Sequence, residues 1–338
     1  MTITHYLDAI APGTTSKNQA VWQVLDRLSG VLYFLILVVL FIAIKPGALT
    51  PGTASTLLQL SVPLLVIATG MTFCLVCGEV DLSVAGIAGL TSTVTALQLD
   101  LGWGWPSAVG MGLAVGLTVG MINGVLTAWL AASFPRFPSF LVTLATLSIT
   151  TGAALALQPM QQPIAINHTA FKEIFGFTDS VISSYPTWYA VVVVAVAYFV
   201  LTKSSFGYAM YAVGTNARAA RLVGFDVLRS KFWVLTISGL LAAFGGILMA
   251  GYVQAGFHVI ATGIEVDAIA AAVIGGTALF GGRGTVLGTI VGVLTLGLLN
   301  TGLLIMEIHV NGQLIIKGAL VILALVIGEY VRERATRS

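Results

Sequence analysis

Charged residues are scarce in this chain. Lys, Arg, Asp and Glu make up 8% of its 338 residues, whereas soluble globular domains carry about 25%. This scarcity excludes a soluble globular protein. The two cysteines, Cys74 and Cys77, are too few for a disulfide-rich secreted scaffold. They have CxxC spacing, but no further Cys and no nearby His accompany them, so we expect two buried apolar side chains rather than a metal or redox pair.

Signatures of catalysis are also missing. The chain contains no GxxxxGK phosphate-binding loop followed by Ser or Thr, so we do not expect it to hydrolyse ATP itself. Its histidines, His5, His168, His258 and His309, are scattered and form no ligand motif. No nucleophile is paired with a base in a recognisable arrangement. The sequence therefore predicts a protein that is not an enzyme and that binds no metal or cofactor.

Hydrophobic residues, in contrast, make up 57% of the chain, and its mean hydropathy is +1.00. Long stretches contain no charge at all, and a spanning helix needs roughly 20 mainly apolar residues. We predict an all-α polytopic membrane protein with about ten transmembrane helices. These helices are expected near residues 29–45, 55–77, 82–100, 107–131, 137–158, 186–202, 231–251, 264–280, 285–306 and 312–330. The last spans are the least regular, because glycines interrupt the apolar run at Gly275, Gly276, Gly281 and Gly282.

The basic residues predict the orientation. If the N-terminus lies in the cytoplasm, 12 of the 15 basic residues lie on that side, as the positive-inside rule requires. These are Lys17, Arg27, Arg136, Lys203, Arg218, Arg221, Arg229, Lys231, Arg283, Arg332, Arg334 and Arg337. Lys45 and Lys172 then lie outside, and Lys317, within the last span, is expected to snorkel toward an interface. We predict a multi-pass membrane protein with both termini in the cytoplasm.

This topology divides the chain into a membrane domain and short cytoplasmic segments. The predicted divisions are a cytoplasmic N-terminal segment (1–28), a transmembrane domain (29–330), a cytoplasmic loop within it (203–231) and a cytoplasmic tail (331–338). The largest outer segment, residues 159–185, is longer than a tight connection requires. Two interpretations stay open for it: a surface where an extracytoplasmic partner docks, or an ordinary loop with a short helix lying on the membrane.

Two ladders of glycines recur at intervals of four residues. Small residues at this spacing let another helix approach closely, so that van der Waals contact replaces the hydrophobic force that lipid cannot supply. We therefore interpret the ladders as packing surfaces and expect their helices in the middle of a compact bundle. The ladders consist of Gly112, Gly116, Gly120 and Gly124, and of Gly284, Gly288 and Gly292.

A short internal repeat carries the acidic residues of the membrane domain. Glu79 and Asp81 begin EVDLSVAGIAG, and Glu265 and Asp267 begin EVDAIAAAVIGG. In the predicted topology the two copies start at opposite membrane faces, as in the inverted repeats of transporters. The carboxylates, with Ser83, either line a polar path or cap helices. For Asp81 we favour capping, because a carboxylate suits the free N–H groups at a helix start.

The loop 203–231 carries five basic residues. Its middle reads as a short helix over 216–222, capped by Asn216, with Gly214 before it and Gly224 after it marking its ends. Within it, Arg218 and Arg221 share a helix face, and Ala219 and Ala220 are small enough to let the helix sit deeply in a partner. Such a helix is suited to dock a cytoplasmic protein; the alternative is a basic loop that only sets topology, and composition alone does not decide between the two.

Three segments resemble the permease subunits of ribose/xylose-type bacterial ATP-binding-cassette (ABC) sugar importers. CGEVDLSVAG at 77–86 resembles the GGIDLSVG segment of that family. AVGTNARAARLVGF at 212–225 resembles its cytoplasmic AIGGNxxAARLSGI loop, and GGTALFGGRGTVLGTIVG at 275–292 resembles its GGTSLxGGxGxxxGTxxG segment. Their order and spacing fit, from about residue 30 onward. Glu79 departs from the family, which usually has an uncharged residue there.

The resemblance implies a type II ABC importer-like permease in the bacterial inner membrane and a set of partners. Two permease copies, identical or paralogous, would form the path for a monosaccharide or related polyol. A cytoplasmic ABC ATPase, double-length in many such systems, would bind ATP and Mg and dock on the 216–222 helix. A periplasmic solute-binding protein would deliver the solute. Membrane lipid surrounds the chain, and no nucleic-acid partner is expected.

Other functions remain open at this point. One is an ABC permease for a different solute, such as a branched-chain amino acid. Another is an ion-coupled secondary transporter, in which Glu79, Asp81, Glu265 and Asp267 serve as coupling groups. A membrane-embedded enzyme is the third, and the lack of a catalytic constellation argues against it. The sequence does not name the solute.

Overall fold

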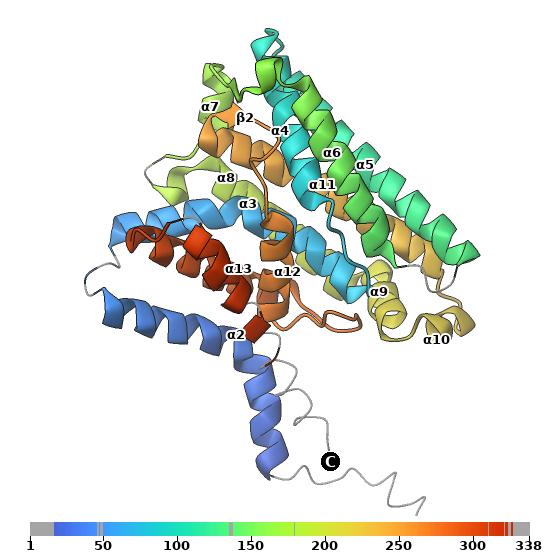
Figure 1. Ribbon diagram of the computed structural model, residues 1–338. Helices are drawn as coiled ribbons and strands as arrows, with labels where there is room; N and C mark the ends of the chain where they lie inside the picture. Colours follow the sequence, from blue (N-terminus) through green and yellow to red (C-terminus); the bar gives the residue numbers. More distant parts are fainter. Residues whose placement is uncertain are drawn as a thin grey trace, which may run out of the picture.

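The computed structural model (Figure 1) describes residues 17–45, 47, 50–134, 138–178, 180–309, 311–320, 322–323 and 326, with the backbone alone for 17–29. The described chain is mostly helical, which confirms the predicted fold class. The long helices are α2 (Lys17–Ile44), α3 (Pro51–Val76), α4 (Val84–Asp100), α5 (Trp105–Ser133), α6 (Ser139–Leu157), α8 (Tyr185–Lys203), α11 (Val227–Val253) and α13 (Val286–Ile305). The short ones are η1 (Pro159–Gln161), α7 (Thr169–Phe175), η2 (Val181–Ser183), α9 (Ser205–Thr215), α10 (Ala217–Leu222) and α12 (Ile264–Ile274).

Fewer helices than expected are long enough to span a membrane. Among the described residues, six qualify by length and composition, α3, α5, α6, α8, α11 and α13, with a shorter apolar stretch at Gly30–Ile44. The expected span at 264–280 is wrong, because α12 has 11 residues. At 1.5 Å per residue it is about 17 Å long, whereas the hydrocarbon core is about 30 Å thick. The helix stops at Gly275 because Gly276 takes a φ of +88°, a value that glycine adopts readily.

Two opposite ends of the bundle can be distinguished. At one end, here called the α10 end, α9 and α10 lie near the C-terminal ends of α3 and α5 and the start of α11 (Figure 1). At the other, the β1–β2 end, strand β1 (Ile164–Ala165) pairs antiparallel with β2 (Ala255–Gly256). Both chain termini, on which the predicted orientation depends, lie outside the described residues.

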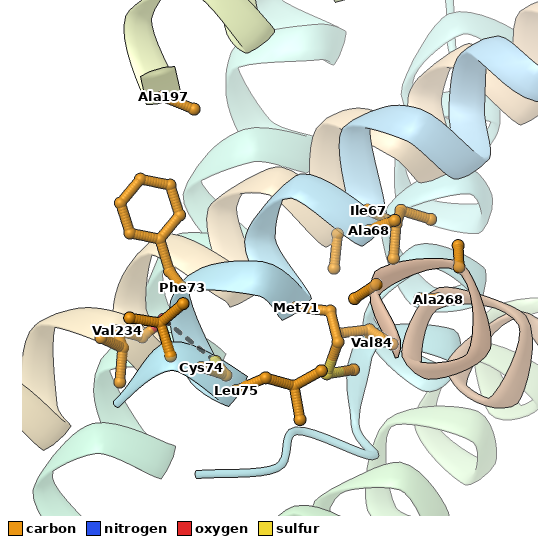
Figure 2. Close-up of a cluster of buried hydrophobic side chains, with 14 of the residues drawn as sticks. Ile67, Ala68, Met71, Phe73, Cys74, Leu75, Val84, Ala197, Val234 and Ala268 are labelled. Atoms are coloured by element: carbon orange, nitrogen blue, oxygen red, sulfur yellow. Dashed lines mark hydrogen bonds between the residues drawn. The ribbon is translucent and has the colours of Figure 1, made fainter. Parts of the chain in front are cut away.

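The core forms where α3, α4, α11 and α12 meet. Figure 2 shows α3 side chains such as Phe73 and Met71 close to residues of the neighbouring helices, among them Val84, Val234 and Ala268. Cys74 lies in this cluster, and its thiol donates to the Val234 carbonyl oxygen at 3.5 Å. Both cysteines are buried and free. Their environment agrees with the expectation of two small apolar side chains.

The central helices also bury many hydroxyl groups. Most of α4 is buried, including Ser92 and Thr93. Several of these hydroxyls find acceptors on their own helix: Thr93 donates to the Gly89 carbonyl at 2.9 Å, and Thr72 of α3 donates to the Ala68 carbonyl at 2.7 Å. Because such bonds satisfy the hydroxyl within one helix, small polar residues are tolerated in an apolar core and allow neighbouring helices to come close.

The first glycine ladder forms the contact between α5 and α11. A Cβ added at Gly116 would meet the Ala243 side chain, and one added at Gly120 would lie 2.9 Å from the Leu235 carbonyl oxygen. Only this face of α5 is buried, whereas most of its other residues are exposed. The expectation that α5 lies in the middle of the bundle is therefore wrong. Lipid-facing residues in a membrane helix are apolar too, so hydropathy does not distinguish the two faces.

Gly120→Ala is expected to lower the free energy of unfolding by about 1–3 kcal/mol, the usual cost of overpacking. Its Cβ would lie 2.9–3.1 Å from the backbone atoms of Leu235, Thr236 and Gly239, which cannot move aside independently. Gly110→Ala on the same helix is the matched control, since a Cβ there meets nothing within 4 Å. Thermal unfolding of the purified variants measures the difference. Equal midpoints for the two variants would contradict the packing role.

Candidate functional site

The α10 helix is set up by its own sequence. Asn216 has an extended backbone, and its side-chain oxygen accepts from the backbone N–H groups of Arg218 and Ala219 at 3.1 Å each. Beyond the helix, Gly224 has a φ of +94°, which glycine adopts without the strain of a Cβ. The cap at Asn216 and the stop at Gly224 are therefore as the sequence predicts.

The rest of the 203–231 region is more ordered than a loop. Residues 205–215 form α9, capped by Ser204, whose Oγ accepts from the Gly207 N–H at 3.0 Å. Gly214 lies inside α9, so the prediction that it marks the start of the short helix is wrong. Serine is a preferred N-cap residue, because its hydroxyl oxygen accepts from a free N–H at the start of a helix. Ser204 is therefore the sequence signal for α9 that was missed.

The exposed face of α10 differs from the expected one. Ala219 is exposed, but Ala220 is buried against the chain's own core. Ala220 therefore cannot seat in a partner, which corrects that part of the prediction. Leu222 and Val223 instead project outward, 88% and 74% exposed. The signal that sequence reasoning overlooked is a pair of large apolar residues, Leu222 and Val223, between Arg221 and Gly224 in a polar segment.

Four glycines lie where three segments meet at the α10 end. These are the segments 77–86, 212–225 and 275–292, which resemble sugar permeases. Gly78, Gly281 and Gly282 have positive φ angles, and the Gly282 N–H donates to the Val76 carbonyl at 2.9 Å. A Cβ added at Gly281 would lie 2.7 Å from the Gly214 oxygen and 3.0 Å from the Gly78 Cα. We call Gly78, Gly214, Gly281 and Gly282 the glycine junction. It joins the end of α3, the end of α9 and the loop between α12 and α13.

An ion pair fixes the break between α3 and α4. The Lys231 ammonium contacts the Glu79 carboxylate, and Glu79 is only 5% exposed. Lys231 lies in the second turn of α11, which follows α10 directly. The pair therefore connects the chain just after α10 to the centre of the bundle. Its attraction offsets the large cost of removing the two charges from water.

A hydrogen-bond network continues from this break. Asp81 accepts from the Ser83 N–H at 2.9 Å and from the Ser83 hydroxyl at 2.5 Å. The Asn123 amide donates to Ser83 Oγ at 2.9 Å and accepts from the Thr146 hydroxyl at 2.6 Å. Ser83, not Asp81, occupies the N-cap position of α4. Asn123 and Thr146 were missed, although Asn123 is the only amide in the 107–131 span.

The second acidic pair begins α12 and is separate from the first. Glu265 and Asp267 lie in the first turn of α12. Asp267 pairs with Lys317 at 3.3 Å, so Lys317 is tied to a carboxylate rather than snorkelling as expected. Among the described residues, no hydrogen bond or ion pair joins Glu265 or Asp267 to the pair at the α3–α4 break.

The second glycine ladder packs α13 against α12. A Cβ at Gly288 would meet the Gly275 carbonyl, and one at Gly292 would meet the Ala271 carbonyl. Gly284 precedes α13 and contacts Thr277. The ladder therefore holds α12 and α13 closely side by side.

The described residues of the predicted outer segment, 159–178 and 180–185, are part of the bundle. Phe171 and Phe175 of α7 are buried, stack on each other at 4.9 Å, and Phe175 contacts the rings of Trp105 and Tyr189. The β1–β2 pair ties the segment to the end of α11. His168 caps α7, accepting from the Phe171 N–H at 3.3 Å. The short helix exists, but it packs inward and does not simply rest on the membrane.

The sequence is similar to one protein family and to several known proteins. A family model described as "Branched-chain amino acid transport system / permease component" matches residues 53–325. The L-arabinose ABC transporter permease protein AraH of Azospirillum brasilense is 34% identical over 96% of this chain and 94% of its own. The ribose import permease protein RbsC is 32% identical in Bacillus subtilis, over 90% of this chain and 93% of its own. The Escherichia coli RbsC is 30% identical, over 87% and 90%. No solved structure matches the chain.

Proposed function

Because this chain belongs to the permease-component family of ABC transport systems, we propose that it forms the path for a monosaccharide or related polyol in an ATP-driven, binding-protein-dependent importer. The chain is a multi-pass inner-membrane permease subunit. Permeases of this family associate with an ATPase and a solute-binding protein. The sugar substrate is proposed from the names of the relatives, which are permeases for L-arabinose and ribose.

The observation that carries the proposal is the convergence of three segments beside α10. The segments that resemble sugar permeases, 77–86, 212–225 and 275–292, meet at the glycine junction. Next to it, α10 presents arginines together with the exposed Leu222 and Val223. An apolar centre with a charged rim is typical of a protein–protein contact. We therefore assign this end to the partner ATPase, which hydrolyses ATP with Mg while the permease does not.

The distribution of charge supports the same orientation. The α10 end holds Lys203, Arg218, Arg221, Arg229, Lys231 and Arg283. Lys172 lies on α7, and Lys45 donates to the Ile305 carbonyl at the far end of α13. By the positive-inside rule the α10 end is cytoplasmic, and the β1–β2 end then faces the binding protein. A second permease copy, identical or paralogous, completes the path.

An amino-acid permease is the second candidate, because the family model carries that description. The ion-coupled alternative is weaker, since Glu79 and Asp267 are each held by a lysine. A carboxylate that couples ion flow must exchange its cation, and a paired lysine competes for that position. An amino-acid permease is therefore the alternative function that the experiment must distinguish from a sugar permease.

Uptake of radiolabelled solutes tests the proposal. Cells that carry the chain with its ATPase and binding protein are expected to take up an aldose such as L-arabinose or ribose, and uptake stops when the ATPase is inactivated. Cells lacking only this chain are the control. Uptake of leucine instead of sugars would support the amino-acid permease. Uptake that survives loss of the ATPase but collapses with the proton or sodium gradient would support the ion-coupled transporter.

A further inference from the structure

Three polar side chains gather at the β1–β2 end of the bundle. Gln158 directly follows α6, Gln98 lies in the last turn of α4, and His258 lies in the segment between β2 and α12. His258 Nδ1 and Gln158 Oε1 lie 2.5 Å apart. We call Gln98, Gln158 and His258 the outer polar cluster. Because the β1–β2 end faces the binding protein in the proposed orientation, the solute enters the path at this end.

The packing of α4 against α6 brings Gln98 close to Gln158. Val94 of α4 and Ala154 of α6 belong to one buried apolar cluster, and groups near the starts of the two helices are also in contact. The helices therefore run side by side in the same direction. Gln98 and Gln158 each follow four residues later, on the same helix face as Val94 and Ala154. The two amides thus lie at the same level, where α4 and α6 end.

The segment that carries His258 enters the bundle beside α4. The Ser92 hydroxyl donates to the Phe257 carbonyl at 3.3 Å, and a Cβ added at Gly89 would meet the His258 carbonyl. Gly89 lies about 17 Å before the C-terminal end of α4. Figure 1 shows this non-helical segment, in orange, running from β2 toward α12. Irregular backbone at membrane depth is tolerated where it is buried in protein or lines a water-filled path, and transporters bind substrates at such breaks.

Two buried atoms of the outer polar cluster are available to a ligand. Gln158 is only 5% exposed, and its Nε2 amide group has no hydrogen-bond partner among the described residues. The same is true of the buried Oε1 atom of Gln98. Unpaired polar atoms in a protein interior are costly and rare. One of these atoms is a donor and the other an acceptor, and a hydroxyl group can pair with both. Gln98 and His258 are half-buried, so the cluster adjoins the outer surface.

We propose that the outer polar cluster binds hydroxyl groups of the transported solute. This inference rests on the proposed function and names the place where the path recognises a sugar. Gln158 Nε2 donates to a solute hydroxyl, Gln98 Oε1 accepts from one, and the His258 imidazole holds the Gln158 amide in position. Amide groups suit a neutral monosaccharide. The ammonium and carboxylate groups of an amino acid are held best by groups of opposite charge.

Sugar uptake and ATP hydrolysis by the reconstituted transporter test this site. The permease, its ATPase and its binding protein are placed in proteoliposomes and supplied with L-arabinose or ribose. Gln158→Leu is expected to lower uptake about tenfold, the effect of one lost hydrogen bond. ATP hydrolysis stimulated by the sugar-loaded binding protein is expected to stay unchanged. Gln98→Leu is a second variant with the same expected result. Gln162→Leu is the matched control, because this amide is exposed and lies four residues beyond Gln158.

The two readouts distinguish solute binding from a structural role. Normal uptake in both Gln158→Leu and Gln98→Leu overturns the proposal, as does an equal loss of uptake in Gln162→Leu. A parallel fall in stimulated ATP hydrolysis would show that the amides only hold α4 and α6 together, and it overturns the proposal too. In these cases the wild-type complex still imports sugar, so the proposed function survives. A wild-type complex that imports no aldose would refute the proposed function, and the sugar site with it.

Discussion

Replacing Leu222 by aspartate is expected to lower solute uptake about a hundredfold while the amount of inserted permease stays unchanged. Leu222 is 88% exposed, so its replacement removes little internal packing and is expected to leave the fold intact. At a docking interface, burial of a leucine contributes about 2 kcal/mol, and a carboxylate in an apolar groove adds a desolvation cost. Since 1.4 kcal/mol corresponds to a factor of ten, the sum approaches a hundredfold.

The measurements are uptake, co-purification of the ATPase and quantified membrane insertion. Leu222→Ile is the matched control, because it keeps an apolar side chain of equal size at the same position. It is expected to retain most of the uptake. Ala220, in contrast, is unsuitable as a probe of docking: it is buried, so a charged side chain there disrupts the chain itself. If Leu222→Asp inserts, co-purifies with the ATPase and transports normally, α10 is not the docking element.

Replacing Lys231 by methionine is expected to lower the free energy of unfolding by about 3–5 kcal/mol, the usual effect of leaving one charge of a buried ion pair alone. Glu79 is 5% exposed and its carboxylate contacts the Lys231 ammonium. Without the lysine, Glu79 stays in the interior with no opposite charge. The thermal unfolding midpoint of the purified protein reports the loss.

The Glu79→Gln, Lys231→Met double variant is expected to recover most of this stability, because no charge is then buried alone. Lys317→Met provides a control of the same chemistry. Its partner Asp267 has a side chain 18% exposed, against 6% for Glu79, and the longer contact of 3.3 Å is easier to lose. A smaller effect is expected there. A double variant as unstable as Lys231→Met would show that the lysine acts through something other than the pair.

Local features of α10 were predictable because they depend on neighbouring residues. Asn216 caps the helix and Gly224 ends it, as the sequence indicates. The same reasoning failed for α9, where the Ser204 cap was overlooked. It also failed for α12. The apolar run there is as hydrophobic as a membrane span, but glycines end the helix before it is long enough to cross the membrane.

The partners of the acidic residues were not predictable. Glu79 meets Lys231 across 152 residues, and Asp267 meets Lys317 across 50. Both lysines were assigned from the sequence to other roles, as a topology signal and as a snorkelling side chain. Hydropathy and helix periodicity describe each segment by itself, so neither predicts which segments lie close together in the folded protein.

The sequence alone predicts the all-α membrane class, the glycine ladders, the α10 cap and the resemblance of three segments to sugar permeases. Helix packing, in contrast, determines that these segments meet at the glycine junction, that Ala220 faces inward, and that Leu222 and Val223 face outward. Caps, turns and hydropathy are predictable because they arise within one or two turns of chain. Burial and close backbone approach instead depend on which helices pack together, and in a membrane both faces of a helix can be apolar.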